Sequence, residues 1–156
     1  MIQIFLFYIR SNNYTSGTRQ FEGYATFDLN TNDECIMQVF GSNDAGNATL
    51  LMIRAFNANG GEIRISSSQV IATGARARWY RINVIHVQPT SSTNPGRVIV
   101  YIDGVKKYEK ADTAIPTSAD PNYFKYGCYG TVSATTVPAK VLWRNVKVFQ
   151  DGQPPQ

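Results

Sequence analysis

The stretch Tyr123-Phe124-Lys125-Tyr126-Gly127-Cys128-Tyr129 predicts a strand whose two faces differ in chemistry. Side chains alternate along an extended chain, so Tyr123, Lys125, Gly127 and Tyr129 share one face. A lysine ammonium favours the phenolate form of a nearby tyrosine, and a glycine leaves room for a ligand. This face can therefore carry acid/base chemistry. An ordinary aromatic strand explains the same seven residues, and both interpretations stay open at this point.

The rest of the chain has the same character on either side of this stretch. Its apolar segments are short, rich in β-branched or aromatic residues, and bounded by turn residues, which indicates antiparallel strands. Asp103-Gly104 and Asn59-Gly60-Gly61 mark two tight hairpins. The predicted strands are Ile2–Ile9, Gln20–Leu29, Glu34–Phe40, Thr49–Phe56, Glu62–Ser67, Trp79–Val87, Arg97–Ile102, Lys106–Glu109, Phe124–Tyr129 and Lys140–Phe149. So many strands in one small domain predict an all-β, two-sheet antiparallel sandwich, a concanavalin-like jelly roll.

Length and composition limit the classes of protein that remain. A chain of 156 residues fits one domain, which we expect to span residues 1–150 and to leave 151–156 as a flexible tail. The net charge of +4 is too small to indicate a nucleic-acid partner. The apolar start is too short to cross a membrane and lacks the features of a signal peptide, so we interpret it as a strand. No residue pattern indicates a metal site or a cofactor.

The alternation of side chains separates a polar face from a core face. Gln38, Arg54 and Lys125 interrupt otherwise apolar strands, as expected of a binding surface. By the same alternation Cys35 and Cys128 both point toward the core, either as two free thiols or as a disulfide. The single histidine, His86, and the tryptophans Trp79 and Trp143 fall on the pattern of core residues.

Several segments in order along the chain resemble the alginate-lyase-like superfamily, and in particular its plant citrate-binding proteins and fungal glucuronan lyases. The resemblance covers roughly residues 13–149. It rests on Tyr14–Gly17, Gln20–Gly23, Ile36–Gly41, Arg81–His86, Val100–Val105 and Tyr123–Tyr129. It implies a jelly roll whose concave sheet binds acidic polysaccharide and cleaves it by β-elimination. In that reaction the site must stabilise the charge that develops on the uronate carboxylate.

The resemblance also implies roles for individual residues. Gln38 matches the glutamine that neutralises the carboxylate, Tyr129 matches the tyrosine that serves as acid and often as base, and Lys125 matches the lysine beside it.

The chain departs from the family pattern in three places. Ile4–Tyr8 stands where the family has a strand with two arginines, Phe40 replaces a histidine found in many lyases, and Thr131 replaces a glutamine. Arg10 or Arg54 is a candidate substitute for a lost arginine.

These features favour a lectin-like binder of acidic oligo- or polysaccharide, or of a small carboxylate, with a degenerate active site. We expect Arg54, Phe40, Tyr123 and Arg10 to contribute to its ligand site. An active polyuronate lyase that uses Tyr129 as acid and base is the alternative, and a structural or defence protein acting through its loops is a third. Two glycosylation sequons fit an extracellular protein, and the apolar first strand makes a homodimer plausible.

Overall fold

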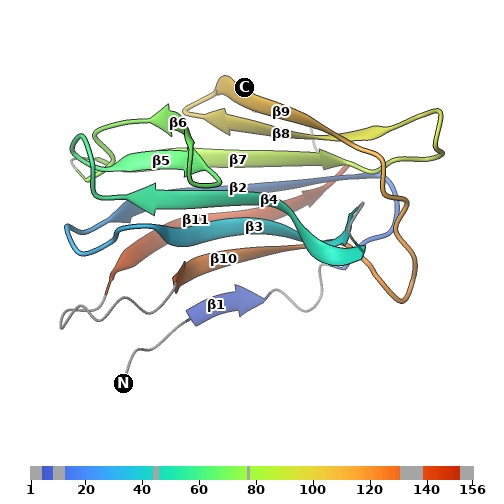
Figure 1. Cartoon of the computed structure of the whole chain (residues 1–156), viewed down its shortest axis with the longest axis horizontal. Helices are drawn as coiled ribbons and strands as arrows, with labels where there is room; N and C mark the ends of the chain where they lie inside the picture. Colours follow the sequence, from blue (N-terminus) through green and yellow to red (C-terminus); the bar gives the residue numbers. More distant parts are fainter. Residues whose placement is uncertain (1–4, 9–12, 44–45, 77, 131–138, 152–156) are drawn as a thin grey trace.

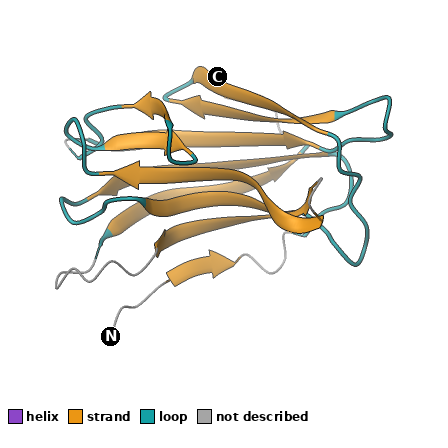
Figure 2. Ribbon diagram, in the orientation of Figure 1, coloured by secondary structure: helices purple, strands orange, loops and turns teal. Residues whose placement is uncertain are grey.

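The computed structural model describes residues 5–8, 13–43, 46–76, 78–130 and 139–151 (Figure 1). These residues form two antiparallel sheets that pack face to face, as the sequence predicts. The first has the order β1-β10-β3-β4-β5-β6 and consists of Phe5–Tyr8, Tyr123–Gly130, Glu34–Asn43, Gly46–Phe56, Glu62–Ile65 and Gln69–Ala72. The second has the order β11-β2-β7-β8-β9 and consists of Val141–Gln150, Thr18–Phe27, Tyr80–Val87, Gly96–Ile102 and Val105–Asp112. Every regular element in the described ranges is a strand (Figure 2).

Both predicted hairpins are present, and their residues explain the turns. Asp103 and Gly104 have φ angles of 51° and 83°, the positive values that a two-residue type I′ turn requires between β8 and β9. The Asp103 carboxylate accepts a hydrogen bond from the backbone N–H of Arg81 at 2.9 Å, which fixes this turn against β7. Asn59, Gly60 and Gly61 also have positive φ angles and connect β4 to β5.

The core lies between the two sheets and is built by alternate residues of the central strands. Phe21 and Phe124 face each other with ring centroids 5.9 Å apart, and each is fully buried. Trp143 of β11 packs edge-on against Phe21 at 5.6 Å, so its prediction as a core residue is confirmed. The prediction for Trp79 is wrong, because this residue precedes β7 and lies under the Arg144 guanidinium, 4.4 Å from it.

Three buried polar residues, Tyr14, His86 and Asp112, form a hydrogen-bonded group at one end of the core. His86 is fully buried, its Nδ1 lies 2.8 Å from the Tyr14 hydroxyl, and its Nε2 lies 2.9 Å from Asp112 Oδ2. A carboxylate can only accept, so Nε2 carries a proton, and Nδ1 lies where it can accept from the Tyr14 hydroxyl. Burial raises the pKa of Tyr14, which keeps its hydroxyl protonated. His86 is thus the satisfied core histidine that its position in the strand predicts.

Two features of the first sheet differ from the prediction. The short strand β6 is absent from the predicted set, because Gln69-Val70-Ile71-Ala72 is too short to show an alternating pattern. Cys35 also faces the other way, because β3 contains a β-bulge between Cys35 and Met37. There Met37 pairs with Ile53 while Cys35 pairs with the neighbouring Arg54.

The bulge puts the two cysteines on opposite faces of the sheet. Cys35 turns to the side of Arg54, while Cys128 lines a cavity with Trp143 of the opposing sheet. Both are free thiols in the structure. The prediction that both point toward the core is therefore wrong for Cys35. Among the described residues, the structure contains no helix long and apolar enough to cross a membrane.

Candidate functional site

The face of the first sheet that points away from the core, here called the outer face, carries the polar residues singled out in the sequence. Gln38 of β3 pairs directly with Lys125 of β10 and with Met52 of β4. Directly paired residues point to the same side of a sheet. Gln38 and Lys125 alternate with the fully buried Val39 and Phe124, which places them on the outer face. Neighbouring side chains cover Gln38, which is only 4% exposed.

Lys125 lies over two aromatic rings. Its Nζ is 3.7 Å from the centroid of the Phe40 ring and 5.3 Å from that of Tyr123, and the two rings are 5.6 Å apart. A cation over aromatic faces is attracted by their quadrupoles. Burial lowers the pKa of Lys125, which the Cys35 thiol partly opposes. No carboxylate of the described residues lies within ion-pair distance of Lys125, so its charge is available to a ligand.

Arg54 lies on the same face but is already engaged. Its Nε donates to Asp33 Oδ1 at 2.7 Å, its Nη2 donates to the Asp33 carbonyl, and its Nη1 lies 3.0 Å from Met52 Sδ. Asp33 can hold this position because it adopts a positive φ of 59° in the turn before β3. A guanidinium with these partners has little left to offer a ligand carboxylate.

Two further residues reach the outer face without having been assigned to the site. Cys35 lies opposite Arg54, and burial raises its pKa to about 11, with Arg54 acting in the opposite direction, so the thiol is protonated at neutral pH. Arg64 of β5 also pairs with Arg54, and its Nη2 forms an ion pair with Glu62 at 2.5 Å. The alternation of Arg64 with Ile63 and Ile65 is the signal that could have found it.

Tyr129 stands at the far end of β10, beyond a second β-bulge. The register slips between Tyr126 and Tyr129, and Gly127 in the bulge has a φ of 146°. Tyr129 pairs with Cys35 and is 46% exposed. Cys35 and Gln38 are three positions apart along β3, a distance on the order of 10 Å. The structure thus groups Gln38, Lys125, Phe40 and Tyr123, and sets Tyr129 apart on the same face.

The remaining predicted positions concern the start of the chain. Arg10 lies outside the described residues, as does Thr131. The backbone of β1 pairs with β10, with Tyr8 opposite Lys125. A sequence that lacks the two arginines therefore occupies the strand next to the site. In the part of the chain that the structure describes, no three histidine, cysteine or carboxylate residues are grouped to hold a metal ion.

Comparisons with known proteins identify one family. A family model described as polysaccharide lyase matches residues 14–146. A citrate-binding protein of Hevea brasiliensis is 31% identical over 142 residues, which are 91% of this chain and 54% of that protein. The chain therefore spans about half the length of this curated relative.

Solved structures show the same fold at low sequence identity. A marine PL7 alginate lyase from Zobellia galactanivorans superposes with a TM-score of 0.66 and 17% identity, covering 89% of this chain and 64% of the lyase. An alginate lyase from Pseudomonas aeruginosa gives a TM-score of 0.65 and 13% identity, covering 89% of this chain and 68% of that lyase.

Proposed function

The chain belongs to the polysaccharide lyase family, and from this premise we propose that it binds an acidic oligo- or polysaccharide, or a small carboxylate, with a degenerate active site. The observation that carries the proposal is the pairing of Lys125 with Gln38 on the outer face. Lys125 supplies a positive charge without a carboxylate partner among the described residues, and the largely covered Gln38 lies directly beside it. Phe40 and Tyr123 supply flat apolar surface against which a sugar ring can pack.

The ligand class follows from the same chemistry. A carboxylate accepts hydrogen bonds from an ammonium, whereas a neutral sugar would leave the Lys125 charge unpaired. The relative from Hevea brasiliensis is named for binding citrate, and its 31% identity supports a small carboxylate as one candidate. The alginate lyases among the structural neighbours make a uronate polymer the other.

Weak or absent catalysis is proposed because the groups that β-elimination needs are missing or occupied. The carboxylate beside the carbanion must be neutralised as charge develops, and losing such a donor costs about 10²–10³ in rate. Arg54 is held by Asp33, and Phe40 has no proton to exchange where the family resemblance implies a histidine. Loss of a general base costs on the order of 10²–10⁴ more.

Calorimetric titration with polyglucuronate, alginate and citrate tests the proposal. We expect at least one of the three to bind, and Lys125→Met to weaken it about tenfold, the lower range for a hydrogen bond to a charged group. Lys147→Met, which removes an exposed cation from β11 in the other sheet, is the matched control and should bind as the wild type does. Absence of heat with all three ligands would reject the proposal.

A second candidate function is an active polyuronate lyase, which the placement of Tyr129 favours. Its side chain is exposed on the face that bears Gln38 and Lys125, and no described residue hydrogen-bonds its hydroxyl. In this reaction the Tyr129 phenolate takes the C5 proton, the electron pair forms the C4–C5 double bond, and the bond from C4 to the glycosidic oxygen breaks. The phenol then returns the proton to the leaving oxygen. Gln38 would stabilise the carboxylate.

Ultraviolet absorbance of the unsaturated product separates the two candidates. If the chain is a lyase, incubation with polyglucuronate or alginate raises the absorbance, and Tyr129→Phe lowers the rate by about 10²–10⁴. Product formed at the same rate by the variant would exclude Tyr129 from the chemistry. Binding without product is the outcome that our first proposal expects.

We also propose an extracellular location and a homodimer formed through β1. β1 is the outermost strand of the first sheet, so its free edge can pair with the same strand of a second copy. Sedimentation at increasing protein concentration, and detection of the protein in the culture medium of cells that express it, test these two points.

A further inference from the structure

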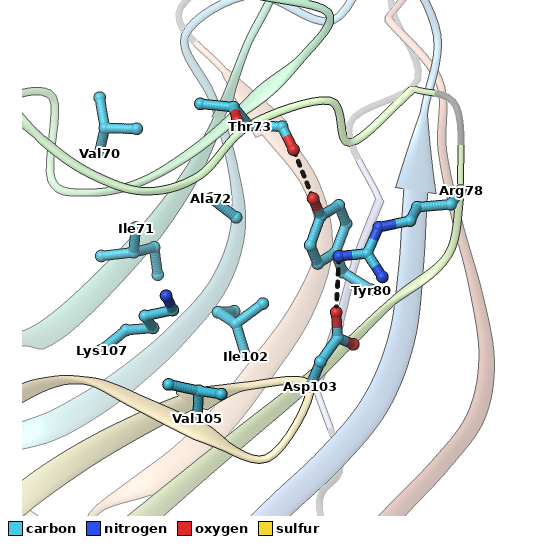
Figure 3. Close-up of a pocket in the computed structure, with 10 residues that line it drawn as sticks. All are labelled: Val70, Ile71, Ala72, Thr73, Arg78, Tyr80, Ile102, Asp103, Val105 and Lys107. Atoms are coloured by element: carbon cyan, nitrogen blue, oxygen red, sulfur yellow. Dashed lines mark hydrogen bonds and ion pairs between the residues drawn. The ribbon is translucent and has the colours of Figure 1, made fainter.

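A second cavity lies at the β6 edge of the sandwich, away from Gln38, Lys125, Phe40 and Tyr123. It has a volume of about 480 Å³, is open to solvent, and lies between β6 of the first sheet and the β8–β9 hairpin of the second (Figure 3). Cavities of about 300–1,000 Å³ are typical of small-molecule sites. The residues that line it do not include Gln38, Lys125, Phe40 or Tyr123.

The inner part of this cavity is aliphatic. Ile71 of β6 and Ile102 of β8 are 6% and 3% exposed and form the part nearest the core. At the rim, Val105 of β9 is 56% exposed, whereas Val70 pairs with Arg64 and so points to the outer face. Val105 leaves apolar surface in contact with water, which a hydrocarbon group in the cavity would cover.

One polar side chain at the rim, Arg78, contacts two neighbours. The Arg78 guanidinium lies 3.9 Å from the centroid of the Tyr80 ring, and its Nη2 is 2.9 Å from Asp103 Oδ2. The Tyr80 hydroxyl is fixed in turn by donating to the Thr73 carbonyl. A guanidinium has five N–H donors, so Arg78 retains donors for a ligand after contacting Asp103.

A second cation approaches from the opposite wall. Figure 3 shows the Lys107 side chain extending from β9 toward Ile71, with its ammonium at the cavity. Within the described ranges no carboxylate forms an ion pair with Lys107, whereas the adjacent Lys106 pairs with Glu109 at 3.0 Å. The cavity thus holds two cations and one carboxylate, Asp103, which Arg78 already engages. One positive charge remains beside an aliphatic interior.

We propose that this cavity binds a small amphipathic carboxylate. The hydrocarbon part lies between Ile71 and Ile102, and the carboxylate accepts hydrogen bonds from the Lys107 ammonium and from Arg78. A sugar does not fit this surface, because its hydroxyl groups would lose water against aliphatic side chains without gaining partners. The charge at the rim selects an acid over the corresponding alcohol.

Calorimetric titration with octanoate and with octanol tests this proposal on the intact chain. Octanoate should bind and octanol should bind more weakly. Lys107→Met keeps most of the aliphatic stem and should weaken octanoate about fivefold, the effect of one exposed ion pair. Lys106→Met, at the neighbouring position on β9, should leave octanoate binding unchanged. No binding of octanoate, or equal loss in the two lysine variants, would overturn the proposal.

Two more variants locate the bound acid. Val105→Trp places a large ring at the exposed rim and should block octanoate, while a thermal melt shows whether the variant is folded. Lys125→Met should leave octanoate binding intact. If Lys125→Met abolishes it and Lys107→Met does not, the acid occupies the outer face and the assignment of this cavity is wrong.

Discussion

The strongest test of the buried polar group at the end of the core is Tyr14→Phe. The substitution keeps the ring, which packs against Phe124 with centroids 5.7 Å apart, and removes only the hydroxyl. His86 Nδ1 then loses its partner at 2.8 Å in a place that water does not reach, since His86 is fully buried. The change therefore isolates one buried hydrogen bond.

The expected magnitude follows from this burial. A buried acceptor left without a donor costs about 1–3 kcal/mol, so we expect the free energy of unfolding to fall by about 2 kcal/mol. In a domain of this size each kcal/mol lowers Tm by about 2–4 °C, which gives a fall of about 4–8 °C.

Urea unfolding followed by circular dichroism measures the change directly. Tyr108→Phe is the matched control, because Tyr108 is also partly packed against the core and no described residue hydrogen-bonds its hydroxyl. It should stay within about 0.5 kcal/mol of the wild type. A Tyr14→Phe variant as stable as the control would refute the view that Tyr14 satisfies His86.

Three further predictions concern the backbone, the thiols and the binding site. Gly41→Ala should destabilise the fold by roughly 3 kcal/mol in urea unfolding, because Gly41 has a φ of 131° and an added Cβ would lie 2.2 Å from the Pro121 carbonyl oxygen. Cys35 and Cys128 should react with a thiol reagent at pH 7.5 only after denaturation, because burial raises their pKa values to about 11 and about 12, and two thiols should then be counted. A disulfide would give none. Binding of polyglucuronate should weaken as the pH rises from 7 to 10, because burial lowers the pKa of Lys125 and its ammonium loses its proton before an ordinary lysine would. Calorimetry on Lys125→Met, which should lack this pH dependence, checks the assignment.

The sequence predicts well those features that depend on local chemistry. Asp103-Gly104 can form its turn without help from the rest of the chain, and the alternation around Phe124 depends only on one side facing the core. The outward positions of Gln38 and Lys125 also follow from the alternation in each strand, whereas their direct pairing is a finding of the structure. The family resemblance added that the ligand site lies on one sheet, the concave one.

The features that the sequence could not predict depend on the pairing and register of the strands. The bulge that turns Cys35 outward exists only in the pairing of β3 with β4, so alternation counted along β3 alone places the thiol on the wrong side. The hydrogen bond from Arg54 to the Asp33 carboxylate joins residues 21 positions apart, so no local pattern shows it. β6 is four residues long, and its pairing with β5 is what makes it a strand.

Two of the four edge strands, β1 and β9, differ in the charge that they present to other chains. β9 ends the second sheet and carries Lys106, Lys107 and Lys110, whose charges repel an approaching strand and so protect the protein from aggregation. The sequence of β1, Phe5-Leu6-Phe7-Tyr8, has no such charge. Aggregation during storage or overexpression would therefore begin at β1, and a lysine in place of Phe7 is the simplest change for improving solubility.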